Sequence, residues 1–166
     1  MVYIDIENCD KEKYLELLRY IFRECNQVTF HFPNFTNTGC VDVRLTNDGE
    51  TNAEYVEYLA RNAMLIRSCL NSGGIKKTTK VYNGVKLAYN TQMIQANLSE
   101  SIKVLLKRTH LYNWLYPDLP EDVCFFRNGL CRYLSESHEQ IFIMCNEKKE
   151  DIDFLKNMGF SFRIKR

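Results

Sequence analysis

One hairpin signal in the C-terminal third constrains the fold more than any other feature of this chain. The dipeptide Asn128-Gly129 joins two apolar segments, 122–127 and 130–135, and it favours a two-residue turn because both corner residues must adopt positive φ. The length of such a turn sets the register of its strands, and with it the side chains that share a face. The predicted register pairs Phe126 with Cys131 and Cys124 with Tyr133 on one face, and places Phe125, Leu130, Arg132 and Leu134 on the other.

Apolar periodicity divides the rest of the chain between short strands and amphipathic helices. Alternation with a period of two predicts a half-buried strand, whereas apolar residues at i, i+3, i+4 and i+7 predict a helix with one buried face. A second Asn-Gly pair, Asn83-Gly84, predicts another hairpin. We therefore expect strands at 2–6, 28–32, 41–45, 140–145 and 160–164, and helices after Asp10, at about 52–71, at about 99–112 and after Asn146.

Some segments carry more specific expectations. Residues 90–97 are mostly polar and are interpreted as a connection into the following helix. His31 alternates with apolar neighbours and is expected on a solvated strand face, and His110 at a solvated helix end. The helix at about 52–71 is expected to bury Val56, Leu59, Ala60, Ala63 and Leu70.

The recurrence of hairpins indicates the fold class. Strands outnumber helices, so the sequence favours an α+β fold, with a mixed or largely antiparallel sheet and about four helices packed on it. The length of 166 residues fits a single globular domain spanning 1–166. Within it, residues 1–75 and 110–166 can be interpreted as two sub-lobes joined by the basic segment 76–109.

The composition indicates a globular protein with a buried core. Hydrophobic residues make up 45% of the chain and aromatic residues 13%, at a net charge of +1. The longest apolar runs are too short for a transmembrane helix, and the first residues include Asp5 and Glu7 where a secretory signal needs basic residues. We therefore expect a cytoplasmic protein that has no membrane partner.

The cysteines favour structural roles over chemistry. They are odd in number and scattered, without CxxC or Cys/His spacing, so they predict reduced thiols that fill the interior as small hydrophobes. No metal site and no cofactor is expected on this pattern. The seven are Cys9, Cys25, Cys40, Cys69, Cys124, Cys131 and Cys145.

Positive charge is concentrated in the middle of the chain. Segment 76–108 holds seven basic side chains against Glu100 alone. Such a surface can bind phosphates or an acidic protein groove; the alternative is a solvated rim, whose lysines protect a hairpin from edge-to-edge pairing. The candidate binding residues are Lys76, Lys77, Lys80, Lys86, Lys103, Lys107 and Arg108, with Tyr82 interleaved.

Aromatic residues precede Pro117. Tyr112, Trp114 and Tyr116 alternate along the sequence there, and Tyr and Trp dominate the energetics of protein interfaces. Trp114 is therefore a candidate binding residue. The alternative interpretation is that Trp114 anchors this segment onto the core.

His138 and Glu139 are the weak candidates for catalysis. They lie between two strands, where histidine can exchange a proton near neutral pH and a carboxylate can orient it. Adjacent strand residues point to opposite faces, so the alternative is that His138 binds a backbone carbonyl and Glu139 an arginine. The sequence contains none of the GxSxG, HExxH, P-loop or GxGxxG patterns that mark common catalytic and nucleotide-binding sites.

The C-terminal half resembles a known group of sequences. From about Trp114 to Phe162 it is similar to small Firmicute proteins labelled "stage III sporulation protein AH". The resemblance implies a bacterial or phage origin and a compact soluble domain, and it implies no activity. It is carried by Pro120-Glu121-Asp122, Cys124-Phe125-Phe126, Asn128-Gly129-Leu130-Cys131, Ser137-His138-Glu139, Leu155 and Gly159.

Three functional hypotheses follow from the sequence. The leading one is a small cytosolic, non-catalytic binding module of a bacterium or phage that acts on another protein, for example as an inhibitor or immunity-type protein. The first alternative is nucleic-acid binding through the basic 76–108 face, which predicts affinity that falls steeply with salt. The second alternative is an enzyme with His138 as general acid or base, which the variant His138→Ala would inactivate.

Overall fold

One antiparallel sheet of eight strands organises the molecule, in the order β10-β1-β9-β8-β7-β2-β6-β3. The computed structural model describes residues 1–34, 53–70, 75–78, 81–82, 85–86 and 90–165. Strands and helices together make the α+β fold that the sequence predicts. The strands of the sheet are β1 (Val2–Ile4), β2 (Gln27–Asn34), β3 (Ile75–Thr78), β6 (Asn90–Asn97), β7 (Glu121–Arg127), β8 (Leu130–Glu136), β9 (Ile141–Met144) and β10 (Phe162–Ile164).

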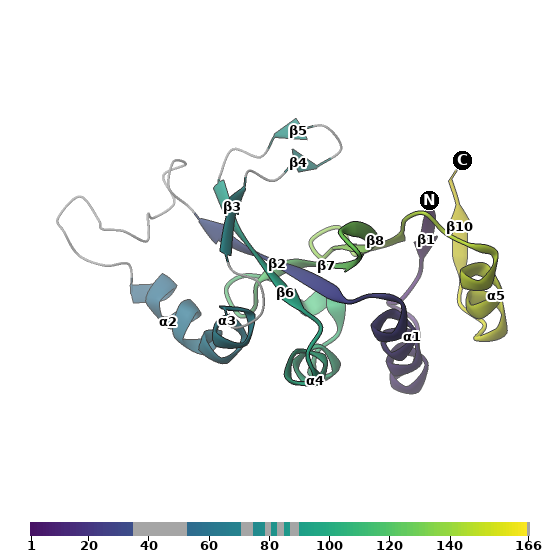
Figure 1. Ribbon diagram of the computed structural model, residues 1–166, viewed down its shortest axis with the longest axis horizontal. Coiled ribbons are helices and arrows are strands. Elements are labelled where there is room, and N and C mark those ends of the chain that lie inside the picture. Colours follow the sequence, from purple (N-terminus) through teal and green to yellow (C-terminus); the bar gives the residue numbers. More distant parts are fainter. Residues whose placement is uncertain (35–52, 71–74, 79–80, 83–84, 87–89, 166) are drawn as a thin grey trace.

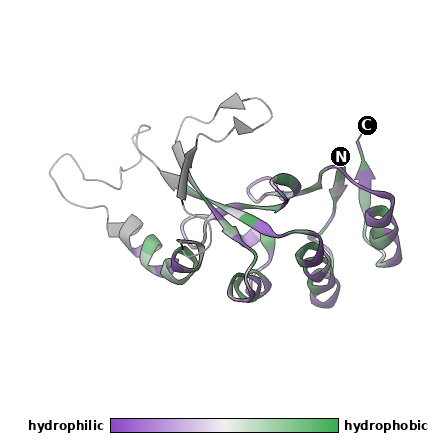
Figure 2. Ribbon diagram, in the orientation of Figure 1, coloured by the Kyte–Doolittle hydropathy of each residue, from purple (hydrophilic) through white to green (hydrophobic). Residues whose placement is uncertain are grey.

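The helices lie along one side of this sheet (Figure 1). The coloured parts of the helices carry both hydrophilic and hydrophobic residues (Figure 2), as expected for amphipathic helices that turn one face toward a sheet. In the described residues five α-helices occur, where about four were expected. They are α1 (Lys11–Glu24), α2 (Ala53–Arg61), α3 (Ala63–Leu70), α4 (Glu100–Arg108) and α5 (Lys149–Asn157), with a short 3-10 helix, η1 (Leu111–Asn113).

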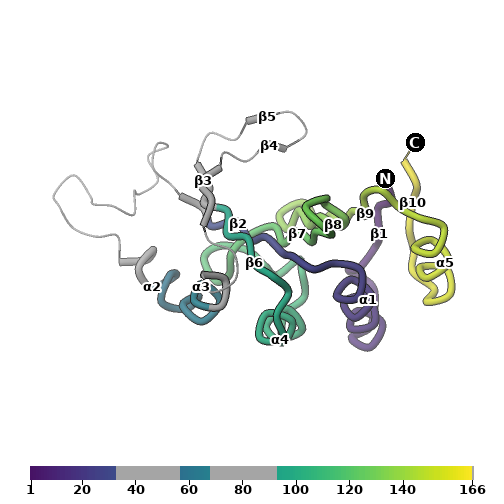
Figure 3. Tube along the Cα trace, in the orientation of Figure 1, coloured from purple at the N-terminus to yellow at the C-terminus, as the bar shows by residue number. Residues whose placement is uncertain are grey.

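The two ends of the described chain meet at one edge of the sheet. β1 pairs with β10 on one side, with Val2 opposite Ile164, and with β9 on the other, with Val2 opposite Met144. The purple and yellow ends of the trace therefore run side by side (Figure 3). Both neighbours of β1 thus come from the last quarter of the sequence.

β2 lies inside the sheet, between β6 and β7, and is buried on both faces. Val28 and Phe30 are fully buried, and Phe30 stacks on Trp114 with 5.2 Å between the ring centroids. Thr29 and His31, on the other face, are only 1% and 7% exposed. The expectation of a half-buried strand with a solvated His31 is therefore wrong, because alternation along one strand does not reveal what covers its polar face.

Residues 90–97 form strand β6, not a connection to a helix. β6 pairs with β2 along eight positions and with β3 on its other side. Ile94 and Ala96 point into the core and are buried, and Gln95 between them is half-buried. The strand was missed because polar residues supply most of its sequence, and its backbone pairing, not its apolar content, holds it in the sheet.

The predicted helix at about 52–71 is interrupted at Asn62. The Asn62 side chain is buried and donates hydrogen bonds to the carbonyls of Tyr58, at 2.9 Å, and Asp118, at 3.0 Å. A side-chain amide that competes for backbone carbonyls ends regular helix in this way. Tyr58 and Leu65 are buried, and the predicted core residue Leu59 is half-buried against them. The predicted core residues Ala60 and Ala63 are exposed, so their prediction is wrong. The side chains of Val56 and Leu70 lie outside the described residues.

The predicted helix at about 99–112 ends at Arg108 and is followed by η1. His110 begins η1: its Nδ1 accepts from the Tyr112 amide at 3.3 Å, and its Nε2 donates to the Ile6 carbonyl at 3.0 Å. The Leu111 amide donates to the Tyr14 hydroxyl at 2.9 Å. His110 is thus half-buried and structural, and the expectation of a solvated histidine is wrong.

The β7–β8 hairpin has the predicted turn and a register that differs by one residue. Asn128 and Gly129 have φ of 51° and 81°, and Phe126 pairs with Cys131 as predicted. The predicted pairing of Cys124 with Tyr133 is wrong, because the register shifts between Phe125 and Phe126. Arg132 is the extra residue of this β-bulge. The observed pairs beyond the bulge are Phe125 with Tyr133 and Cys124 with Leu134.

Helix α5 begins two residues later than predicted. The expected cap, Asn146, has a φ of 51° and lies outside the helix. Lys148 is the N-cap residue, and the Asp151 carboxylate accepts its backbone amide at 2.7 Å. Gly159 ends the helix with a φ of 66°, as predicted for a left-handed C-terminal residue.

Several expectations lie outside the described residues: the strand at 41–45 and the turn residues Asn83-Gly84. The hairpin predicted around that turn is present, because Val81 pairs with Lys86 and Tyr82 with Val85 in β4 (Val81–Tyr82) and β5 (Val85–Lys86). Across the described part of the chain, none of the helices has the length and apolar character that crossing a bilayer requires.

Candidate functional site

The start of β7 and the end of β8 bring His138 against a buried carboxylate. His138 Nε2 donates to Oε1 of Glu121 at 3.0 Å. The histidine side chain is 58% exposed, whereas the glutamate side chain is 5% exposed. The carboxylate therefore fixes one edge of the imidazole ring and leaves the rest of the ring accessible to another molecule.

Asp122, next to Glu121, holds the turn that carries His138. Its Oδ1 accepts the Ser137 amide at 2.8 Å, and its backbone carbonyl accepts from the His31 ring at 3.2 Å. Burial raises the pKa of Asp122 to about 6, although the Ser137 amide and His138 act in the opposite direction. Its φ of 50° is rare for a residue other than glycine.

Ser137 connects the same turn to η1. Its hydroxyl is buried and donates to the Leu111 carbonyl at 3.1 Å, and it lies 3.2 Å from the Ser135 hydroxyl. The Gln140 amide closes the turn onto the Ser137 carbonyl at 3.2 Å. These contacts tie residues 137–140 to the core, so the position of His138 is set by buried hydrogen bonds.

A cavity of about 410 Å³ adjoins this turn through Gln140. Its charged lining residues are Asp5, Glu7 and Arg163, and the Arg163 guanidinium lies 4.9 Å from the centre of the Tyr3 ring. Burial, and then the negative charges of Asp5 and Glu7, raise the pKa of Tyr112. The aromatic lining residues are Tyr3, Tyr112, Phe142 and Phe162.

His138 and Glu139, the two residues that the sequence singled out, do not contact each other through their side chains in the way a catalytic pair would; His138 has another partner. Glu139 is exposed, and the carboxylate that meets His138 is Glu121, seventeen positions earlier in the chain. The hairpin register could have predicted the contact between Glu121 and His138. Counting along both strands from the Asn128-Gly129 turn brings position 121 close to positions 136–138. Segments 120–122 and 137–139 thus contact each other.

The predicted binding residues are not all gathered in one place. Trp114 is 2% exposed and stacked on Phe30, so it belongs to the core, as the alternative interpretation held. On α4, Lys103 pairs with Glu100 at 2.7 Å, Lys107 lies 5.7 Å from the Phe22 ring, and Arg108 is exposed.

The remaining basic candidates lie in the segment before β6. Lys76 and Lys77 are in β3, whereas Tyr82 and Lys86 are in the β4–β5 hairpin. Lys80 lies outside the described residues. A shared basic face therefore stays a prediction.

The described cysteines are free thiols. Cys25 and Cys124 are buried, and Cys9, Cys131 and Cys145 are half-buried. Among the residues with described placement, no three histidine, cysteine or acidic side chains are grouped so as to hold a metal ion.

The chain was compared with protein-family models, with curated proteins and with solved structures. None of the three comparisons gives a match. The contacts of residues 121–122 and 137–140 and the adjoining cavity are therefore what supports a functional assignment.

Proposed function

We propose that the chain is a non-catalytic binding module that acts on another protein, in the cytoplasm of a bacterium or its phage. The docking surface is the cavity lined by Tyr3, Asp5, Glu7 and Tyr112, together with the neighbouring turn 137–140. The observation that carries the proposal is this aromatic-walled cavity next to an exposed, fixed imidazole. The free thiols fit a reducing compartment.

The surface has features that favour tight protein recognition. Aromatic side chains supply most of the energy at protein interfaces, because they bury a large area and lose little conformational entropy. His138 contributes a ring that is already held in place by Glu121 at 3.0 Å. A group ordered before binding costs less entropy when the partner arrives.

The charges around the cavity indicate the chemistry of the partner. Asp5 and Glu7 are exposed carboxylates at its rim, and together with the half-buried rings of Tyr3 and Phe162 they suit a lysine or arginine side chain. Arg163 already rests on the Tyr3 ring of this chain at 4.9 Å, which is the same type of contact. The occupant of the cavity is therefore a basic side chain of another protein.

Selection from a random peptide library tests the docking surface without knowledge of the natural partner. Immobilised wild-type protein is expected to enrich peptides with a lysine or arginine flanked by apolar residues. Glu7→Lys reverses a charge at the rim and should weaken binding of those peptides at least tenfold, measured by fluorescence anisotropy, because like charges now face each other.

Glu150→Lys is the matched control, since Glu150 is exposed in the first turn of α5. It should bind the selected peptides as the wild type does. The proposal fails if the enriched peptides lack basic residues, or if both variants bind equally well.

Acid–base catalysis is the second candidate function, favoured by the 3.0 Å contact between an exposed histidine and a buried glutamate. In this case His138 exchanges the proton and Glu121 orients the ring. Turnover of a panel of activated esters and phosphoesters should disappear in His138→Gln and persist in His110→Gln, since His110 is committed to the Ile6 carbonyl. Equal rates in wild type and His138→Gln would remove this candidate.

A further inference from the structure

Two half-buried cysteines, Cys131 and Cys145, lie beside each other on neighbouring strands. Tyr133 of β8 pairs with Met144 of β9, and the Cys145 amide continues this ladder by donating to the Arg132 carbonyl at 2.8 Å. Cys131 therefore lies one residue beyond the partner of Cys145.

The β-bulge places both thiols on the same face of the sheet. Arg132 and Tyr133 together oppose Phe125, and both side chains point toward the helices. Cys131, which precedes the bulge, therefore points away from the helices. Cys145, which follows the buried Met144, points the same way.

The two thiols differ in acidity, and the Cys131 thiol donates to the Tyr133 carbonyl at 3.6 Å. The interaction with Cys131 lowers the pKa of Cys145, and the same interaction together with burial raises the pKa of Cys131. The thiolate is the reactive form of cysteine, so Cys145 is the nucleophile of the pair. Cys131 is the resolving thiol, which attacks the mixed disulfide that Cys145 forms.

We propose that Cys131 and Cys145 are a redox modification site that forms an intramolecular disulfide by exchange with a low-molecular-weight disulfide of the glutathione type. The Cys145 thiolate attacks one sulfur of the oxidant, forms a mixed disulfide and expels the first small thiolate. Cys131 then loses its proton and attacks the Cys145 sulfur, and the second small thiolate leaves. Two protein thiols are oxidised, one small disulfide is reduced, and two small thiols are released.

This site is separate from the docking surface. It connects β8 to the segment leading into α5, where Arg132 also donates to the Asn146 carbonyl. A covalent bond here would therefore fix the entry to α5 against the bulge. Cytosolic disulfides of this kind are generally transient and formed under oxidative conditions.

Peptide mapping by mass spectrometry tests the proposal on the reduced, full-length protein after incubation with oxidised glutathione. The wild type is expected to yield a peptide pair linked through Cys131 and Cys145, which disappears on reduction. Cys131→Ser should instead accumulate a glutathione adduct on Cys145, because the second attack is missing. Cys145→Ser should form neither product at these positions.

Cys9→Ser is the matched control, because Cys9 is half-buried and its thiol is bonded to the Ile6 carbonyl at 3.0 Å. It should form the linked pair as the wild type does. A second readout needs no variant: at neutral pH iodoacetamide should alkylate Cys145 several-fold faster than Cys131. The proposal is overturned if the wild type links other cysteines instead, or if the two alkylation rates are equal.

Discussion

Asp122 combines three features at a single residue: a buried side chain, a positive φ and a raised pKa. Its carboxylate holds the Ser137 amide, and through that amide it holds the turn that presents His138. An ionised carboxylate that is 2% exposed loses solvation that the hydrogen bond does not fully replace. Asp122 therefore positions the candidate site at a cost in stability near neutral pH.

Asp122→Asn is expected to stabilise the protein at pH 7. Asparagine keeps the oxygen that accepts the Ser137 amide, tolerates positive φ, and carries no charge to desolvate. The folded pKa of about 6 lies above the ordinary value of 3.8, so the folded state binds the proton more tightly. The contribution of Asp122 to the free energy of unfolding therefore rises as pH falls from 7 through 6 toward 3.8.

Urea denaturation at pH 7 and at pH 4.5 measures this effect. The variant should exceed the wild type by about 2 kcal/mol at pH 7, and the difference should shrink at pH 4.5. Asp153→Asn, at an exposed position of α5, should show no such pH-dependent gain. A variant that is less stable than the wild type at pH 7 would contradict the assignment.

At the scale of single residues, sequence reasoning singled out His138 and missed Glu121, the carboxylate that it contacts. Histidine is recognisable because few side chains titrate near neutral pH. Glu121 is an ordinary glutamate at the start of an apolar strand. What makes it distinctive is that it is only 4% exposed. Burial of a charged residue depends on tertiary contacts, so no local pattern predicts it.

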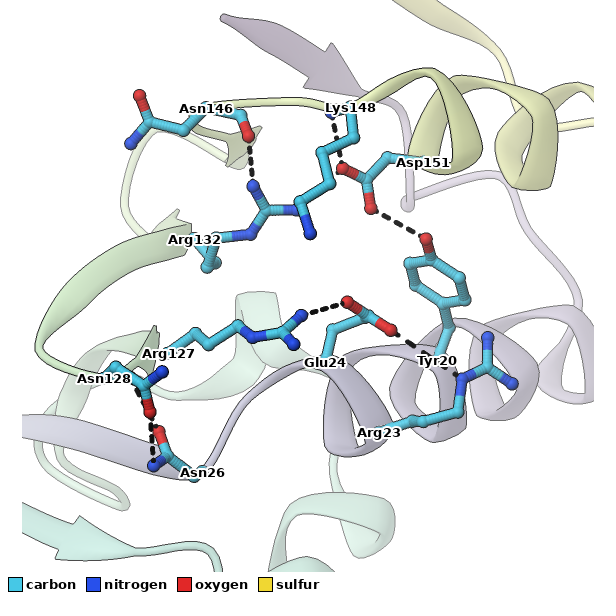
Figure 4. Close-up of polar contacts among 10 residues, drawn as sticks. All are labelled: Tyr20, Arg23, Glu24, Asn26, Arg127, Asn128, Arg132, Asn146, Lys148 and Asp151. Carbon is cyan, nitrogen blue, oxygen red and sulfur yellow. Dashed lines mark hydrogen bonds and ion pairs between the residues drawn. The ribbon is translucent and has the colours of Figure 1, made fainter.

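At the scale of elements, the bulge in β8 joins the sheet to two helices. It turns Arg132 toward α5, where Nη2 donates to the Asp151 carboxylate at 2.7 Å. The Tyr20 hydroxyl of α1 donates to the other carboxylate oxygen, also at 2.7 Å, so that one carboxylate joins three elements (Figure 4). Burial would raise the pKa of Asp151, but the Lys148 amide, Tyr20 and Arg132 outweigh it and lower the pKa below its ordinary value.

Arg132→Met is expected to destabilise the protein by about 3 kcal/mol, because it leaves the Asp151 carboxylate, 1% exposed, without its cation. The loss should lessen on acidification, as protonation relieves the unpaired charge. Arg23→Met is the control: its side chain is 69% exposed and the loss should be below about 0.5 kcal/mol. Equal unfolding free energies for the two variants would show that the bulge does not join these elements energetically.

Element prediction succeeded where periodicity or turn chemistry was strong. Helix α1, with Asp10 as its cap, and the Asn128-Gly129 turn were confirmed. Prediction failed where a polar side chain acts through a distant partner: Asn62 breaks a helix by binding the Asp118 carbonyl, and Arg132 bulges a strand to reach Asp151. Such partners are fixed only when the elements pack together.

At the scale of the whole molecule, the α+β class was predictable because it depends on the number and type of elements. The strand order was not, since it requires knowing that β2 lies beside β7 and that β1 lies between β9 and β10. The basic segment 76–109, interpreted as a connection between sub-lobes, contributes most of β3 and all of β6 to the same sheet as both ends.

The position of β1 between β9 and β10 has a consequence for biosynthesis. Val2 and Tyr3 are synthesised long before the strands that pair with their backbone, Ile141–Met144 and Phe162–Ile164. Pairings so distant in sequence form slowly, because a long loop must close first. A nascent chain therefore keeps the apolar strand β1 unpaired until β9 and β10 have been synthesised, which makes that segment a natural ligand for ribosome-associated chaperones.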